Sequence, residues 1–294
     1  MKPADTRVPV AFGPIPAGVP VDVVLDIGNT ETAVGWFVDG RLAGYGRLAS
    51  DARRTADEWG LWLRQLLAAA SIEPNRVSSV TVASVVPVLT PLWADATVRH
   101  LGRHVGIVDA RCSLPIRLDV EEPFSVGADR IVNTLAAARL FATDCIVVDL
   151  GTATTFDCIT ADGAFLGGVI APGVQTAADN LAVRAAKLPR VELVRPERVI
   201  GRRTETALQS GIFFGAVDAI DGLVERIRRE WGSDARVVAT GGLCTLVAPH
   251  CRTVDTIEPF LTLYGIWLAR PCARSGSALE RGDPDGLYSD VSGP

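Results

Sequence analysis

The sequence predicts an α/β protein with two similar domains, each a mixed β-sheet flanked by helices. The first observation is a repeated pattern at Val23–Thr30 and Ile146–Thr155, where an apolar β-type run ends in a carboxylate followed by a glycine and small polar residues. An Asp-x-Gly turn is common by itself, but its recurrence in register with its strand indicates an internal repeat. The second observation is that a β-hairpin and an amphipathic helix follow the turn in both halves. The duplicated turn predicts two domains that face one another across a nucleotide.

Composition narrows the function classes. The 294 residues are 48% hydrophobic, which allows two ordinary domains with sizeable cores. The net charge is −5 without a basic block, which argues against nucleic-acid binding but not against binding a nucleotide through backbone N–H groups and a metal. The sequence contains neither a signal peptide, nor a run of 18 apolar residues, nor a Cys-x-x-Cys pair. These features predict a cytoplasmic protein without a membrane partner.

The elements of the first half follow from hydrophobic periodicity. Alternating or continuous apolar runs predict its strands, and Asp39-Gly40 is typical of a hairpin turn. Apolar residues at helical spacing, Trp59 and Trp62 among them, predict an amphipathic helix with a core-facing stripe. The expected strands are Val21–Asp26, Thr32–Val38, Arg41–Leu48, Val77–Val85 and Gly106–Asp109, and the expected helices are Thr55–Ala70 and Thr90–Leu101.

The second half repeats this order after an irregular loop at Leu114–Val126 and a long helix at Gly127–Ala142 that could act as a hinge. Glu205–Trp231 is read either as a pair of helices or as one bent helix. The other expected elements are the strands Cys145–Asp149, Thr155–Thr160, Ala164–Ile170 and Arg236–Thr240, and the helices Val174–Ala186 and Thr262–Ala269.

These elements define the expected domain boundaries. The first 20 residues are rich in Pro, Ala and Gly, and the last 24 are rich in Gly, Ser, Asp and Pro, so both ends are expected to be disordered. The expected division is a head at 1–20, an N-terminal domain at 21–142, a C-terminal domain at 143–270 and a tail at 271–294.

A series of motifs makes the chain resemble the type III pantothenate kinases, ATP-dependent enzymes of coenzyme A synthesis. The resemblance runs from about Val23 to Leu268. It implies two ribonuclease-H-like domains of the actin-like ATPase and sugar-kinase architecture, with ATP in the cleft between them. The matching segments, in chain order, are Asp26–Thr30, Arg53–Glu58, Ser84–Pro87, Gly127–Arg130, Asp149–Thr155, Gly167–Gly173 and Thr240–Leu243.

The first turn has residues suited to phosphate. Gly28 allows the backbone to approach phosphate oxygens, and Asn29 and Thr30 add neutral donors. Asp26 would repel phosphate directly, so its useful role is to hold Mg²⁺ or a water molecule on Mg²⁺; the alternative is that it only caps the turn. The resemblance extends the ATP-binding segment to further residues, namely Ile27, Glu31, Thr32 and Ala33.

A second segment, Gly127-Ala128-Asp129-Arg130, begins the long central helix. The resemblance implies that these four residues bind pantothenate and that Asp129 accepts the proton of its primary hydroxyl. Such a base is needed because an alkoxide is too basic to exist free at neutral pH. The structural alternative for Asp129 is an acid that only complements the helix dipole.

The resemblance assigns three further roles. Asp149 would bind a monovalent cation, K⁺ or NH₄⁺, that neutralises the nucleotide phosphates, and Thr152 would contact ATP. Thr204 would contact pantothenate, although it reads equally well as a helix N-cap. The family also implies a homodimer.

One departure leaves the acceptor open. Family members commonly have a Tyr upstream of the Gly-Ala-Asp-Arg motif, whereas this chain has Leu118 and added residues before Pro123. The alternatives are therefore a kinase of the same fold with another small hydroxylated acceptor, or an inactive nucleotide-binding regulator. The regulator is disfavoured by the joint retention of Asp26, Asp129, Arg130 and Asp149.

Overall fold

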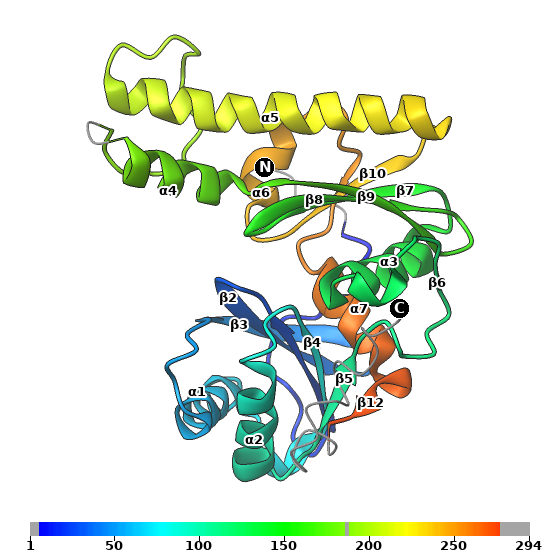
Figure 1. Cartoon of the computed structure of the whole chain (residues 1–294). Coiled ribbons are helices and arrows are strands. Elements are labelled where there is room, and N and C mark those ends of the chain that lie inside the picture. The colour runs from blue at the N-terminus through cyan, green and yellow to red at the C-terminus, as the bar shows by residue number, and fades with distance from the viewer. Residues whose placement is uncertain (1–5, 186–187, 277–294) are drawn as a thin grey trace, which may run out of the picture. The chain divides into compact units, whose positions relative to one another are not determined.

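The computed structural model describes residues 6–185 and 188–276, which form two units (Figure 1). The N-terminal unit contains residues 9–114, 124–132 and 263–276, and the C-terminal unit contains residues 6–8, 115–123, 133–185 and 188–262. This division differs from the single cut expected at residue 142. The reason is that helices α3 (Ala128–Phe141) and α7 (Leu261–Ala269) each begin in one unit and end in the other.

The N-terminal unit contains a mixed six-stranded sheet with the order β12-β5-β4-β1-β2-β3. Strand β1 pairs antiparallel with β2 and parallel with β4, and β4 pairs parallel with β5. Asp39 and Gly40, between β2 and β3, both have positive φ (47° and 78°), as expected for an Asp-Gly hairpin. The strands are β1 (Val21–Ile27), β2 (Glu31–Val38), β3 (Arg41–Ala49), β4 (Val77–Ser84), β5 (Val105–Val108) and β12 (Arg274–Ser275).

The C-terminal unit has the strand order β11-β10-β7-β8-β9-β6, in which the first five strands repeat the order β5-β4-β1-β2-β3 and the sixth lies at the opposite edge from β12. Strand β7 pairs antiparallel with β8 and parallel with β10, as β1 does with β2 and β4. The predicted α/β class with two ribonuclease-H-like mixed sheets flanked by helices is thus confirmed. The strands are β6 (Arg117–Leu118), β7 (Cys145–Leu150), β8 (Ala153–Ile159), β9 (Ala164–Pro172), β10 (Arg236–Thr240) and β11 (Thr256–Ile257).

Helices cover both faces of the N-terminal sheet. On one face lie α1 (Ala56–Ala69) and α2 (Thr90–Leu101) (Figure 1). They contribute Trp59 and Trp93, whose ring centroids lie 4.7 Å apart in the core. Trp62, predicted on the same core-facing stripe, is instead 45% exposed. On the other face α7 places Leu263 against Gly35, where a Cβ would lie 3.2 Å from the leucine.

The C-terminal sheet has α4 (Val174–Arg184) and α5 (Thr204–Trp231) on one face (Figure 1). Helix α5 is one continuous helix of 28 residues rather than a pair. Within the described ranges it is long and apolar enough to pass a length and composition test for a membrane span. However, Ile212, Phe213 and Val217 belong to the core of the unit, which is typical of a core helix.

Several short elements have no counterpart in the sequence-based expectations. They lack a periodic pattern, and strands of two residues form only through pairing with a distant strand. These additions are β6, β11, β12, the single-turn helix α6 (Cys244–Val247) and the 3₁₀ turns at Pro74–Arg76, Pro123–Ser125, Ala248–His250 and Arg270–Cys272.

The segment of residues 9–20 was expected to be disordered but is held on the N-terminal unit. The N–H of Ala11 donates to the carbonyl of Leu42 (2.9 Å), and Leu42 donates to Pro9 (2.8 Å). The guanidinium of Arg76 donates to the carbonyls of Pro16 (2.7 Å) and Val19 (3.1 Å). These partners are remote in sequence, so local composition could not reveal them.

Residues 6–8 are anchored on the C-terminal unit by Glu258, which is completely buried. Its carboxylate accepts hydrogen bonds from the hydroxyl of Thr6 (2.5 Å) and from the N–H groups of Arg7 (2.5 Å) and Val8 (3.3 Å). The tail was expected to be disordered from residue 271, but Arg274 and Ser275 pair with β5 as β12. Residues 1–5 and 277–294 lie outside the described residues.

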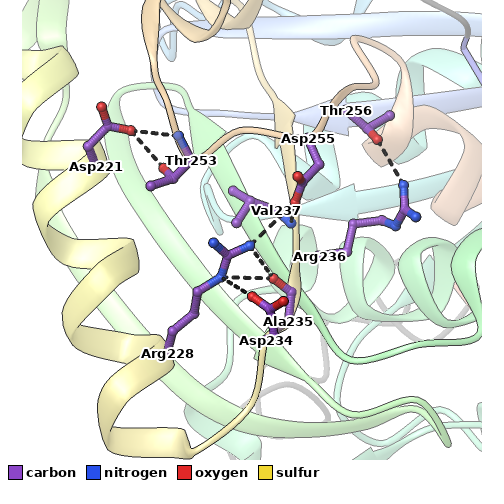
Figure 2. A network of polar contacts seen from close by, with 9 residues as sticks. All are labelled: Asp221, Arg228, Asp234, Ala235, Arg236, Val237, Thr253, Asp255 and Thr256. Carbon is purple, nitrogen blue, oxygen red and sulfur yellow. Dashed lines mark hydrogen bonds and ion pairs between the residues drawn. The ribbon is translucent and has the colours of Figure 1, made fainter.

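Two side chains of α5 fix the surroundings of β10, as Figure 2 shows. Asp221 accepts hydrogen bonds from the N–H (2.9 Å) and the hydroxyl (2.7 Å) of Thr253. Burial raises the pKa of Asp221, but the hydrogen bonds from Arg252 and Thr253 and the positive charge of Arg252 together outweigh it, so the pKa is below its ordinary value. Arg228 donates to the carbonyl of Ala235 (2.7 Å) at the entrance to β10. Arg228 therefore fixes the entrance of the strand that leads into Gly241, whereas Asp221 fixes the Arg252–Thr253 segment.

Candidate functional site

The turn between β1 and β2 carries the predicted phosphate-binding residues. The N–H of Gly28 donates to the carbonyl of Glu31 (3.0 Å), and the hydroxyl of Ser50 donates to the carbonyl of Gly28 (2.6 Å). A Cβ on Gly28 would lie 2.9 Å from the Glu31 oxygen, so the tight turn requires glycine. Asn29 and Thr30 are exposed at its tip. Exposed polar residues at a tight turn are suited to contact an anionic ligand.

The flanking residues of this turn are more enclosed. Asp26 is half-buried near the end of β1, while Ile27 and Thr32 are completely buried. The hydroxyls of Thr32 and Ser50 lie 3.0 Å apart. The buried side chains of Ile27 and Thr32 therefore pack beneath the turn, and Ala33 belongs to β2. Asp26 retains partial access to solvent.

The start of α3 presents a desolvated carboxylate. Asp129 is in the first turn of the helix, and its Oδ1 accepts a hydrogen bond from the N–H of Arg130 (2.8 Å). Burial raises the pKa of Asp129, and this effect exceeds the lowering by the Arg130 N–H and its positive charge. A Cβ on Gly127 would lie 2.5 Å from Oδ1, so glycine leaves room for the carboxylate. A carboxylate with a raised pKa is a better proton acceptor than an ordinary one.

The N-terminal unit brings this carboxylate segment near the phosphate turn. The N–H of Val85 donates to the carbonyl of Ile27 (3.1 Å), at the end of β1. The side chain of the same Val85 lies 3.5 Å from the position that a Cβ on Gly127 would occupy. Val85 therefore bridges two segments that are about 100 positions apart in the sequence.

The C-terminal unit contains the second acid-ended strand. Asp149 is half-buried near the end of β7, and its Oδ2 accepts a hydrogen bond from the side-chain amide of Asn133 (3.2 Å). In the following turn, Gly151 donates to the carbonyl of Ala153 (3.0 Å). The hydroxyl of Thr176 donates to the carbonyl of Thr152 (2.7 Å), so α4 fixes this turn.

The first glycine of the Gly-Gly pair after β10, Gly241, is required by its backbone conformation and by close packing. Its φ is +89°, and a Cβ there would overlap Oδ1 of Asp149 and lie 2.6 Å from the nitrogen of Leu150. Gly241 therefore packs against the carboxylate of Asp149 and the backbone of Leu150, while Gly242 is exposed.

Thr204 lies elsewhere in the C-terminal unit. It is the first residue of α5 and is exposed, and the N-cap position is occupied by Arg203, so the N-cap reading of Thr204 is wrong. Thr204 lines an apolar groove between α4, α5 and the sheet, with a cavity volume of about 520 Å³. Leu118, at the place of the family tyrosine, pairs with Phe165 as part of β6.

The described residues 6–185 and 188–276 contain no group of three His, Cys, Asp or Glu side chains arranged to hold a metal ion. A site assembled from such ligands alone is therefore not present in that part of the chain. The oxygen donors of Asp26 and Asp149 each stand beside an exposed turn, where a hard cation could take its remaining oxygens from a phosphate.

Sequence reasoning missed three residues that support these segments: Ser50, Asn133 and Thr262. It included Val85 in the Ser84–Pro87 segment but gave it no role. Ser50 and Val85 act through hydrogen bonds to remote carbonyls, for which the sequence gives no signal. Asn133 could have been noticed, because it interrupts the apolar face of the α3 sequence four residues after Asp129.

Comparison with known proteins gives a consistent result. The family model of type III pantothenate kinase matches residues 23–226. Relatives named type III pantothenate kinase are 45% identical over 246 residues in Moorella thermoacetica and 43% identical over 244 residues in Dehalococcoides mccartyi. Each alignment covers 83% of this chain, together with 96% and 95% of those relatives, respectively.

A solved structure shows a related fold at lower identity. The ethanolamine utilization protein EutJ from Carboxydothermus hydrogenoformans is 15% identical, with a TM-score of 0.50 over 87% of this chain and 92% of that protein. At this identity the similarity concerns the fold alone.

Proposed function

The chain belongs to the type III pantothenate kinase family, and we propose that it transfers the γ-phosphoryl group of ATP to the primary hydroxyl of pantothenate, giving 4′-phosphopantothenate and ADP. This reaction begins coenzyme A synthesis. The observation that carries the mechanism is the half-buried Asp129, with its raised pKa, on a segment joined through Val85 to the Asp26–Ala33 turn.

The proposed ATP-binding segment is Asp26–Ala33, with Thr152 as a further contact. Phosphoryl transfer depends mainly on positioning and charge stabilisation. The exposed Asn29 and Thr30 supply side-chain donors on a turn whose tight geometry depends on Gly28. Ser50 supports this role by fixing the Gly28 carbonyl.

Asp129 is the proposed general base. As the bond between the pantothenate oxygen and phosphorus forms, Asp129 takes the hydroxyl proton, so a free alkoxide never accumulates. The acceptor is held by Gly127, Ala128 and Arg130, with Thr204 as a further contact. Arg130 supplies a positive charge that suits the carboxylate of pantothenate.

Two cations complete the proposal. Asp26 fits Mg²⁺, directly or through water, because its carboxylate is partly accessible beside the phosphate turn. Asp149 fits a monovalent cation, K⁺ or NH₄⁺, because its carboxylate stands beside the Gly151–Thr152 turn. When bound, these ions would neutralise negative charge on the nucleotide phosphates.

The proposed assembly is a homodimer through the exposed face of α5. This face is a stripe of small residues that borders the apolar groove, and Leu181 of α4 is 42% exposed beside it. Apart from the backbone of α5 and the adjoining residues, no heavy atom of the described residues lies within 4 Å of a Cβ built on Gly211 or Gly215, so a second copy could approach closely. The stripe consists of Ala207, Gly211, Gly215 and Ala219.

Light scattering tests this assembly. The wild-type chain is expected at twice the monomer mass, and Gly215→Arg is expected at the monomer mass because the long side chain fills the stripe. A wild-type monomer at tens of micromolar would contradict the proposal. We further propose a cytoplasmic location, with neither nucleic acid nor membrane as a partner, in keeping with the net charge of −5.

The activity test follows ADP release with and without pantothenate, and mass spectrometry identifies the product. Asp129→Asn is expected to lower kcat by roughly 10²–10⁴-fold, the contribution of a general base. Asp57→Asn is the matched control, because Asp57 is an exposed acid at the start of α1. ATP consumption that is indifferent to pantothenate would favour another acceptor, and nearly wild-type turnover by Asp129→Asn would remove Asp129 as the base.

A further inference from the structure

Asn133 is a buried polar side chain that the proposed function does not use. It lies on α3 in a run of buried residues from Ile131 to Ala137 and is completely inaccessible to solvent. A buried amide is costly unless its polar atoms are paired. The partners of Asn133 are therefore informative.

The amide of Asn133 connects two residues of the C-terminal unit. Its Nδ2 donates to Oδ2 of Asp149 (3.2 Å), and its Oδ1 accepts from the hydroxyl of Thr262 (2.9 Å). Thr262 is only 8% exposed and lies in the first turn of α7. The three side chains thus form a chain of hydrogen bonds from α7 through α3 to β7.

The other carboxylate oxygen of Asp149 faces a different direction. Its Oδ1 lies toward the backbone of Gly151 and Gly241; it is 3.6 Å from a Cβ built on Gly151 and would overlap one built on Gly241. Asn133 therefore holds Oδ2 of Asp149 on the side of α3, while Oδ1 lies on the side of the Gly151 turn. A rotation of the carboxylate would break the hydrogen bond with Asn133.

We propose that Asn133 is a positioning residue that fixes the carboxylate of Asp149 for the monovalent cation, and that Thr262 fixes the amide of Asn133. This inference rests on the proposed role of Asp149 in cation binding. An –NH₂ group donates hydrogen bonds and cannot ligate a cation, so Asn133 acts through Asp149. An aspartate at position 133 would replace the donor by a second negative charge and would not serve this purpose.

The test measures how K⁺ affects binding of ADP to the full-length protein. Calorimetric titrations with ADP are performed over a series of KCl concentrations, with choline chloride holding the ionic strength constant. Asn133→Leu, which removes the donor at similar volume, is expected to raise the half-saturating K⁺ concentration about tenfold, as for loss of a hydrogen bond to a charged group. Thr262→Val is expected to raise it about threefold.

A matched control separates positioning from general destabilisation. Asp221→Asn weakens a buried hydrogen-bond network of the same unit and is expected to lower Tm without changing the half-saturating K⁺ concentration. If Asn133→Leu and Thr262→Val lower Tm but keep the wild-type K⁺ dependence, the positioning role is wrong. If Asn133→Leu does not fold, Thr262→Val decides the question.

Asp149→Asn distinguishes failure of this inference from failure of its premise. Loss of K⁺ dependence in Asp149→Asn, with wild-type dependence in the other two variants, would overturn only the role of Asn133. Retention of the wild-type K⁺ dependence by Asp149→Asn would overturn the cation role of Asp149 and the positioning inference with it.

Discussion

Substitution of Gly241 by alanine tests the close packing between the end of β10 and the Asp149 turn. The φ of +89° costs a residue with a Cβ about 1–2 kcal/mol. The Cβ would also overlap Oδ1 of Asp149 and lie 2.6 Å from N and 2.8 Å from C of Leu150. Because backbone atoms cannot move cheaply, overpacking adds about 1–3 kcal/mol. The expected total loss in the free energy of unfolding is therefore about 2–5 kcal/mol.

Gly232→Ala is the control for backbone strain alone. Gly232 has φ of +72° at the end of α5, and no heavy atom of the described chain lies within 4 Å of a Cβ built there. Its expected loss is about 1–2 kcal/mol. Urea unfolding followed by circular dichroism measures both variants, and the difference between them isolates the steric term. Equal losses would refute the reasoning, because they would mean that Gly241 does not pack against Asp149 and Leu150 in solution.

Three further predictions concern acidity and stability. Turnover is expected to fall as the pH drops through the pKa of Asp129, because the protonated base cannot accept the hydroxyl proton. Burial places this acidic limb of the pH–rate profile above the ordinary pKa of 3.8. A limb at or below pH 3.8 would contradict the prediction. Because the pKa of Asp129 is raised in the folded state, the native protein binds more protons than the unfolded chain between pH 3.8 and the raised pKa. The free energy of unfolding therefore decreases as the pH rises through this window. Urea titrations at several pH values should show that Asp129→Asn removes this decrease. Glu258→Ala leaves the donors of Thr6, Arg7 and Val8 without their buried acceptor and should cost about 2–4 kcal/mol in urea unfolding, whereas an unchanged midpoint would show that residues 6–8 are not anchored there.

Most of the secondary structure could be predicted from the sequence because it depends on local patterns. Helix α2 and strand β10 have the expected bounds, and Asp39-Gly40 forms the expected hairpin. The α5 segment was ambiguous because Gly211, Gly215 and Gly222 lower its helical propensity. Packing of its apolar face on the C-terminal sheet compensates for that deficit.

The site could be predicted only in part. Motifs identified the turns at Asp26–Thr30 and Asp149–Thr152 and the acid at Asp129, because each lies next to glycines and a strand or helix end. The roles assigned to these residues remain predictions. The raised pKa of Asp129 depends on burial by the folded chain, which no local pattern reports.

The sequence by itself determined the duplicated strand–turn–hairpin–helix order, the family and the segments that carry polar chemistry, because hydrophobic period and turn residues act over a few positions. Only the tertiary structure decided which remote groups support those segments. It placed Asn133 between Asp149 and Thr262, set Gly241 against the Asp149 turn and anchored residues 6–8 on Glu258. Each of these contacts joins residues that are neighbours only after the sheets and helices have packed. Such contacts produce no periodic pattern in the sequence from which they could be predicted.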